Sequence, residues 1–153
     1  MVNSLPDLIA GVRVQPLKLV RNERGRLMEV QRNDDAFFLG FGQVYITSTL
    51  PGVVKAWYRH QEQTDQIALV SGSMKLALYD TRDDSSTRGQ VNEILITEAD
   101  PKLVQIPIGV WHGFKAMGEE ELFCIHLNSI AFKPGHPDED RLPPNDPSIP
   151  YSW

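Results

Sequence analysis

Short segments in which apolar residues alternate with polar ones, or run together, recur along the whole chain. Segments of roughly four to eight such residues, bounded by Gly, Pro, Asn or Asp, are typical of β-strands. The sequence predicts strands over Val12–Leu19, Leu27–Val30, Gln43–Thr49, Val53–Arg59, Gln66–Val70, Met74–Tyr79, Val91–Ile96, Leu103–Ile106, Trp111–Ala116 and Leu122–Leu127. A helical period is visible only over 7–10, where it allows one turn before Gly11. About ten short strands at near-regular spacing predict an all-β sandwich or barrel.

The last part of the chain, Lys133–Trp153, differs in composition from the rest. It holds more than half of the eleven prolines, and proline lacks the N–H group that a central strand needs. Its end, Ile149–Trp153, is too apolar for a free tail. We therefore expect residues 1–153 to form one domain, with the proline-rich segment 133–153 packed on the barrel.

Length and charge narrow the class of protein. The 153 residues weigh 17.3 kDa, and 41% of them are hydrophobic and 23% charged, which excludes a disordered or fibrous chain. The formal net charge of -5 makes the surface a poor partner for nucleic acid or an anionic membrane. A local basic pocket for a phosphate-bearing ligand stays compatible with that charge.

The sequence shows no targeting signal, and its cysteine content indicates no particular chemistry. The sequence has no apolar stretch of the roughly 18 residues that a spanning helix needs, and its first residues lack the pattern of a signal peptide. We therefore expect a cytoplasmic protein. The single cysteine, Cys124, excludes an internal disulfide framework and is expected to be a small buried side chain.

Two stretches carry a spaced pattern of polar residues. The first consists of Gly52, five residues, Tyr58-Arg59-His60, four residues, Asp65, six residues and Gly72; the second consists of Pro107, Gly109 and His112. Together they resemble the two signature motifs of the cupin superfamily, with Tyr in place of the first His and Asp in place of Glu. The resemblance implies a double-stranded β-helix, or jelly roll. Because residues two apart on a strand share a face, Tyr58 and His60 should meet His112 inside the barrel mouth.

A closer resemblance extends over nearly the whole chain. The matching segments are Asn22–Glu29, Phe41–Ser48, Gly52–Tyr58, Asp80–Gly89, Ile106–Phe114 and Asn145–Trp153. In this order they resemble the motifs of the dTDP-4-dehydrorhamnose 3,5-epimerases. The resemblance implies a nucleotide-linked 4-keto-6-deoxy sugar as substrate, with dTDP favoured, and a place in deoxysugar or surface-polysaccharide biosynthesis. It also implies proton abstraction next to the ketone, without metal or redox cofactor.

The chain departs from that family at its catalytic positions. The family's catalytic His falls on Tyr58, its enolate-stabilising Lys near Asp65, and its catalytic Tyr near Phe132. A related group of cupins, the sugar-nucleotide 3,4-ketoisomerases, has a Gly-x-His-x-His motif whose second His matches His60. We therefore expect His60 as the base, Tyr58 as a proton donor and His112 as an orienting or relaying group. A tyrosine hydroxyl titrates near pH 10, so it donates more readily than it accepts.

The family resemblance also implies residues that hold the substrate. They are Arg24, Glu29, Gln43 and Lys55. Arg24 is the best candidate for a diphosphate clamp, since a guanidinium binds phosphate oxygens in a bidentate manner. Family members form dimers in which an N-terminal strand crosses to the partner, so a homodimer is expected.

Two alternatives of a different class stay open. In one, His60, Asp65 and His112 hold a metal such as Fe, Mn, Ni or Zn, because three N/O ligands with an open position suit these ions. In the other, the protein binds a sugar nucleotide but has lost its base. Of the remaining polar residues, His126 is expected to serve packing, His136 to lie in a loop, and 138–140 to form a solvated turn.

Overall fold

The computed structural model describes residues 7–153. Within them the chain forms strands and no helix, which confirms the predicted all-β class. The strands are β1 Arg13–Pro16, β2 Leu19–Asn22, β3 Gly25–Met28, β4 Gln43–Thr49, β5 Val54–Arg59, β6 Asp65–Ser71, β7 Ser73–Asp80, β8 Val91–Thr97, β9 Lys102–Ile106, β10 Val110–Ala116, β11 Leu122–Asn128 and β12 Asp140–Arg141. Residues 7–10 form no helical turn, although the N–H of Val12 donates to the carbonyl of Ile9 at 2.9 Å.

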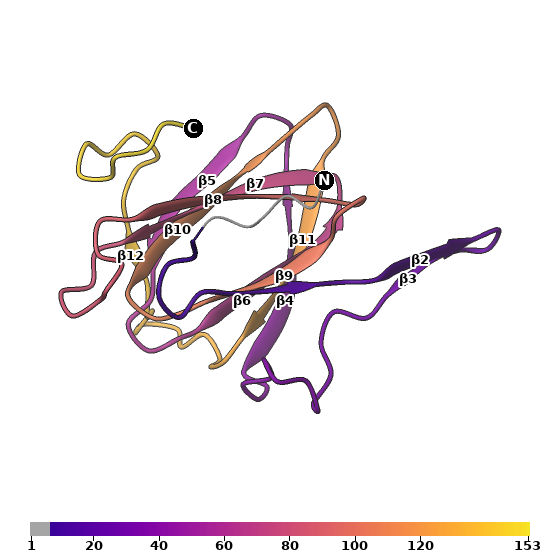
Figure 1. Ribbon diagram of the computed structural model, residues 1–153, viewed down its shortest axis with the longest axis horizontal. Coiled ribbons are helices and arrows are strands. Elements are labelled where there is room, and N and C mark those ends of the chain that lie inside the picture. Colours follow the sequence, from indigo (N-terminus) through magenta and orange to yellow (C-terminus); the bar gives the residue numbers. More distant parts are fainter. Residues whose placement is uncertain (1–6) are drawn as a thin grey trace.

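Two five-stranded antiparallel sheets face each other and form a jelly roll (Figure 1). Sheet A has the order β1-β9-β6-β11-β4, and sheet C has the order β12-β5-β10-β7-β8. Alternation along the strands decides which side chains enter the core between the sheets. In β8, for example, Ile94 and Ile96 are buried, whereas Leu95 between them is 55% exposed. The predicted jelly-roll fold is confirmed.

The N-terminal strand expected over 12–19 is two strands instead. After β1, which pairs with β9 at the edge of sheet A, the chain leaves the sheet at Pro16. Strand β2 then pairs with β3, with Asn22 opposite Gly25, so that a two-residue turn joins them. This β2–β3 hairpin is an arm that projects from the barrel (Figure 1). A proline cannot donate to the next rung of a ladder, which explains the break in the expected strand.

The proline-rich segment adds a short strand at the edge of sheet C. Strand β12 pairs with β5, and Leu142 and Trp57 exchange two backbone hydrogen bonds of 2.7 and 3.1 Å. Further along, the rings of Tyr151 and Trp153 lie 5.8 and 4.9 Å from the ring of Trp57, which is fully buried. The segment therefore packs on the barrel. The two paired residues lie between prolines, which limits the strand to the sheet edge.

One glycine brings the two site-bearing strands of sheet C together. A Cβ atom at Gly113 would lie 2.3 Å from the Cβ atom of Ala56, which no side chain tolerates. The absence of that Cβ lets β10 approach β5 closely, with a register shift between His112 and Phe114. As a result His112 lies directly opposite Tyr58.

Candidate active site

Three polar side chains from both sheets meet in the barrel interior. His60 follows β5, Asp65 begins β6, and His112 belongs to β10. Asp65 Oδ2 lies 3.0 Å from His112 Nε2 and 3.3 Å from His60 Nε2. All three residues are buried, with at most 8% of each exposed. We call them the His–Asp–His cluster, and it joins the residues that motif spacing had suggested.

Backbone carbonyls orient both imidazoles of the cluster. His60 Nδ1 donates to the carbonyl of Asp138, and His112 Nδ1 donates to the carbonyl of Val110 at 3.1 Å. A carbonyl oxygen only accepts hydrogen bonds, so each Nδ1 carries a proton. Each Nε2 therefore faces the same carboxylate, while the amide of Gln63 donates to its other oxygen.

The cluster shifts its own pKa values. Burial by itself would raise the pKa of Asp65, but the hydrogen bonds from His112 and His60 hold it far below its usual range. Burial by itself would lower the pKa of His60, but the hydrogen bond and charge of Asp65 outweigh burial and raise it to about 9. At neutral pH Asp65 and His60 thus form an ion pair, with the negative charge on Asp65.

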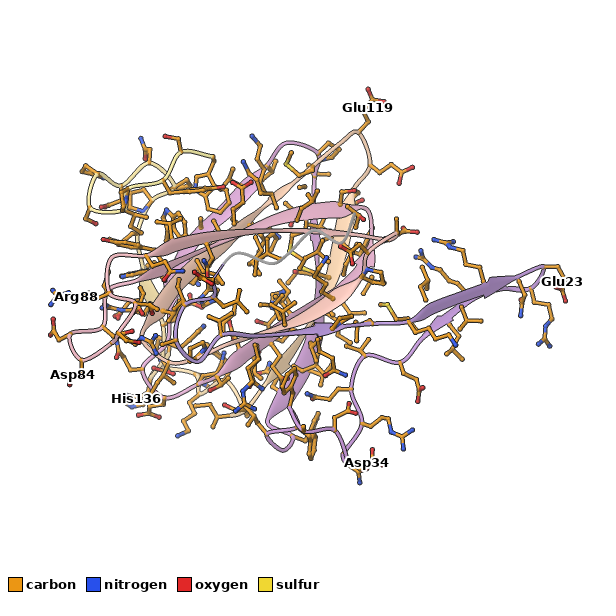
Figure 2. All side chains as sticks on the ribbon, viewed as in Figure 1. Glu23, Asp34, Asp84, Arg88, Glu119 and His136 are labelled. Atoms are coloured by element: carbon orange, nitrogen blue, oxygen red, sulfur yellow. The ribbon has the colours of Figure 1, made fainter. Side chains whose placement is uncertain are left out.

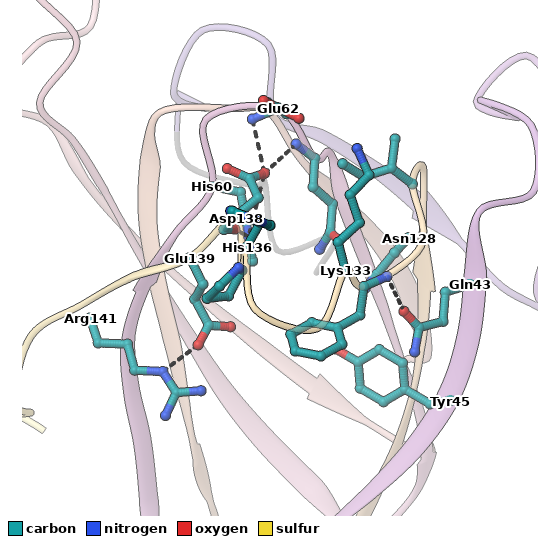
Figure 3. A pocket seen from close by; sticks show the side chains of 14 residues that line it. Gln43, Tyr45, His60, Glu62, Asn128, Lys133, His136, Asp138, Glu139 and Arg141 are labelled. Atoms are coloured by element: carbon teal, nitrogen blue, oxygen red, sulfur yellow. Dashed lines mark hydrogen bonds and ion pairs between the residues drawn. The ribbon is translucent and has the colours of Figure 1, made fainter.

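A cavity of 310 Å³ opens in front of the cluster. Sheet C contributes Tyr58 and His112, whose ring centroids are 6.4 Å apart, and sheet A contributes Tyr45 and His126 on the facing wall. A second cavity of 600 Å³ lies next to it, toward the loop that contains His136 (Figure 3). The residues that line both cavities are Tyr45, His60, Glu139 and Arg141. The two cavities therefore adjoin, and each is of a size that suits a small ligand.

Asp138 is a site residue that the sequence analysis missed. Its carboxylate accepts the backbone N–H groups of Gln61, Glu62 and Gln63 at 2.9, 2.9 and 2.8 Å. These bonds hold the proline-rich segment against the loop that follows β5, which brings the Asp138 carbonyl to His60. The expectation of a solvated turn over 138–140 is wrong at this residue, because its partners lie 75 to 77 positions away in sequence.

His126 packs as expected, with its ring stacked on Tyr45, but it also belongs to the wall of the inner cavity. It is buried and lines the inner cavity, and Thr47 Oγ1 lies 3.0 Å from its Nε2. Burial lowers the pKa of His126 to about 4, so the ring is neutral at pH 7. The sequence could have indicated this position, because His126 lies two and four positions after Cys124 and Leu122 on β11 and therefore shares their buried face.

The residues expected to hold the substrate divide into two groups. Lys55 lines the inner cavity and Gln43 the outer one. Arg24 lies at the turn of the arm and Glu29 follows β3 on the way back to the barrel, and neither lines the inner or the outer cavity. Glu23, next to Arg24, lies at the opposite end of the molecule from His136 (Figure 2).

A jelly roll with imidazoles, a carboxylate and a tyrosine on the walls of an open cavity defines a cupin-type barrel equipped for acid–base chemistry. Residues 7–153 match the family described as dTDP-4-dehydrorhamnose 3,5-epimerase. The chain belongs to this family, which is a family of isomerases, and the predicted resemblance is confirmed. Within residues 7–153 no helix is available that could cross a membrane.

Similar proteins cover nearly the full length of the chain. The spore coat polysaccharide biosynthesis protein SpsL of Bacillus subtilis is 36% identical, over 95% of this chain and 97% of its own. The probable low-salt glycan biosynthesis epimerase Agl13 of Haloferax volcanii is 38% identical, over 95% of this chain and 94% of its own. The crystal structure of a dTDP sugar isomerase from Desulfovibrio desulfuricans superposes with a TM-score of 0.90 at 32% identity, covering 95% and 92% of the two chains.

Proposed function

We propose that the protein is a sugar-nucleotide isomerase that transfers protons next to the ketone of a nucleotide-linked 4-keto-6-deoxy sugar. Its biological setting is deoxysugar or surface-polysaccharide biosynthesis, the setting that the names of its polysaccharide and glycan relatives indicate. Family membership supports the reaction class. The observation that carries the proposal is the His–Asp–His cluster beside a ligand-sized cavity, because it supplies an acid–base group although Tyr58 stands at the family's catalytic His position.

His60 is the base in this proposal. Its Nδ1 keeps the proton that it donates to the Asp138 carbonyl, so Nε2 takes the proton from the carbon beside the ketone, in the fraction of molecules whose His60 ring is neutral. The electron pair left behind moves onto the ketone oxygen and forms an enolate. Asp65 stabilises the imidazolium that results, while the Tyr58 hydroxyl and the Lys55 ammonium line the cavity where the enolate oxygen would be held.

Nucleotide binding is proposed to need two copies of the chain. Glu23 on the β2–β3 arm lies at the opposite end of the molecule from His136, which lines the outer cavity (Figure 2), so Arg24 and Glu29 act in this proposal on the nucleotide of a partner subunit, with dTDP as the favoured nucleotide. Light scattering during gel filtration should find a homodimer. A monomer that binds dTDP with full affinity would contradict this arrangement.

The proton-transfer proposal is tested by NMR in heavy water. Purified protein is mixed with dTDP-, UDP-, GDP- and CDP-linked 4-keto-6-deoxy sugars, and deuterium entry beside the ketone is followed. His60→Asn should slow exchange by about a hundredfold or more, the usual contribution of a general base. Asp83→Asn, which changes an exposed side chain that lines neither cavity, is the control. Binding without any exchange in the parent protein would instead favour a non-catalytic sugar-nucleotide binder.

A metal-dependent cupin is the second candidate function, and one observation favours it. One ligand atom each from His60, Asp65 and His112 lies within 4.8 Å of the others. Both imidazoles also donate Nδ1–H to carbonyls, the arrangement that orients metal-bound histidines. Metal analysis of protein purified without added metal decides between the two. A full equivalent of one transition metal in the purified protein, together with a lower melting temperature after chelation, would overturn the metal-free proposal.

A further inference from the structure

An epimerisation needs proton-carrying groups on two faces of the sugar. The base removes the proton from one face of the carbon, and inversion results only if a second group returns a proton to the opposite face. We infer that Tyr45 is this second group, a catalytic residue on the wall that faces His60. The inference rests on the proposed function and adds the donor that inversion requires.

Tyr58 lies on the wrong side for this task. It belongs to β5, and His60 follows two positions later, so both side chains reach the cavity from sheet C. Two residues that share a strand face approach a bound sugar from the same side. Tyr58 can therefore hold the enolate oxygen near His60, but a proton that it gave to the carbon would restore the original configuration.

Tyr45 approaches from the opposite sheet. It belongs to β4 of sheet A, where Val44 and Ile46 are 42% and 60% exposed and do not line the inner cavity, while Tyr45 and Thr47 do. Tyr45 also lines the outer cavity, as His60 does (Figure 3), so both residues border the junction of the two spaces. A sugar ring at that junction has His60 on one side and Tyr45 on the other.

The ring of Tyr45 is held in place but stays reachable. Tyr45 pairs with His126 across β4 and β11, and the two rings stack at 4.6 Å with an angle of 8° between their planes. The residue is 37% exposed, so a ligand can contact it. Phe132 also lines the outer cavity, and its backbone N–H donates to Gln43 Oε1 at 2.7 Å, but its ring has no hydroxyl.

Among Tyr45, Thr47 and His126 of sheet A, Tyr45 is the best proton donor. Burial raises the pKa of its hydroxyl, so the group keeps its proton at neutral pH and can donate it. The Thr47 hydroxyl lies 3.0 Å from His126 Nε2 and 3.2 Å from Cys124 Sγ, and an alcohol is a much weaker acid than a phenol. The neutral ring of His126 lacks the extra proton that would make it an effective donor.

The proton balance of the step is complete. His60 Nε2 takes a proton from the carbon, and the electron pair of the broken C–H bond forms the enolate. The Tyr45 O–H bond then breaks, its proton forms a new C–H bond on the other face, and the ketone is restored. The tyrosinate takes a proton from water and the imidazolium returns one to water, so no oxidant or reductant is needed.

The test separates exchange from inversion in the full-length protein. In heavy water, Tyr45→Phe should keep deuterium exchange within a few-fold of the parent, because His60 still removes a proton and returns a deuteron to the same face. Inversion at the carbon should fall by about a hundredfold or more, the usual contribution of a general acid. Tyr79→Phe is the matched control, since Tyr79 lies on β7 and lines neither cavity.

Each contrary result has a distinct meaning. Unchanged inversion in Tyr45→Phe, at an unchanged melting temperature, would overturn the assignment of Tyr45 alone. Equal loss of exchange and inversion with intact dTDP binding would also overturn it, because Tyr45 would then act before the proton returns. Absence of exchange in the parent protein would defeat the proposed function and the inference together.

Discussion

Replacing Asp65 by Asn tests how the cluster controls proton transfer. Asp65 Oδ2 faces His112 Nε2 at 3.0 Å and His60 Nε2 at 3.3 Å. The substitution keeps the size of the side chain but removes its negative charge, and an amide oxygen is a weaker acceptor than a carboxylate. The imidazolium of His60 then loses the group that stabilises it, while its burial stays.

The expected change in the pKa of His60 follows from these contacts. The contacts with Asp65 raise its pKa to about 9 in the parent protein, which favours the charged form by roughly a few kcal/mol. Without Asp65, burial is opposed only by the Asp138 carbonyl and the charge of Glu139, so we expect the pKa of His60 to fall to about its ordinary value of 6.5 or below. At pH 7 the neutral fraction should rise from about one part in a hundred to more than half.

The same substitution should lower the free energy of unfolding, by an amount that depends on pH. A pKa raised on folding stabilises the folded state fully below the unfolded value near 6.5, and this contribution disappears as the pH rises through about 9. Loss of one partner from a buried ion pair costs about 3–5 kcal/mol. The free energy of unfolding of Asp65→Asn, measured with urea, should therefore fall most at pH 6, and the gap to the parent should narrow above pH 9.

Two measurements check the prediction. Nitrogen-15 NMR titration reports the pKa of His60, and the pH profile of deuterium exchange reports the base in action. In the parent, exchange should rise with pH and level off near pH 9. Asp83→Asn, which removes an exposed carboxylate that lines neither cavity, is the control. A His60 pKa that stays near 9 in Asp65→Asn would refute the assigned cause.

Three further outcomes are expected. Arg24→Ala should weaken dTDP binding by about 1.5–3 kcal/mol in calorimetry, the range for a hydrogen bond to a charged group, whereas Arg88→Ala should not; equal affinities in Arg24→Ala and the parent would contradict the clamp. Elemental analysis should find less than one equivalent of metal, and a chelator should leave the melting temperature unchanged. Cooperative unfolding on addition of the chelator would contradict this expectation. Asp138→Ala should lose about 1–3 kcal/mol of unfolding free energy, because three backbone N–H groups lose their acceptor. Asp84→Ala, at an exposed residue, is its control, and a loss no larger than in that control would count against the role of Asp138.

The chain sequence by itself determined most of the strands and part of the candidate site, but neither the separate strand β2 nor strand β12. Alternation of apolar and polar residues located ten strands, nearly all with boundaries within one or two residues of the structure. The spacing from Gly52 to Gly72 determined that Tyr58 and His60 share a face, because side-chain direction along a strand depends only on local backbone geometry. The motifs likewise identified the family.

Tertiary structure alone decided the partners of those residues. The Asp138 carbonyl meets His60 across 78 positions of sequence, and Tyr45 meets His126 through the pairing of β4 with β11. Such contacts depend on strand register and on where a loop is pinned, and neither leaves a local pattern in the sequence. The projection of Arg24 on the arm is likewise a consequence of the break at Pro16 and the pairing of β2 with β3. Local physics therefore places the side chains on their strands, and long-range packing assigns them their neighbours.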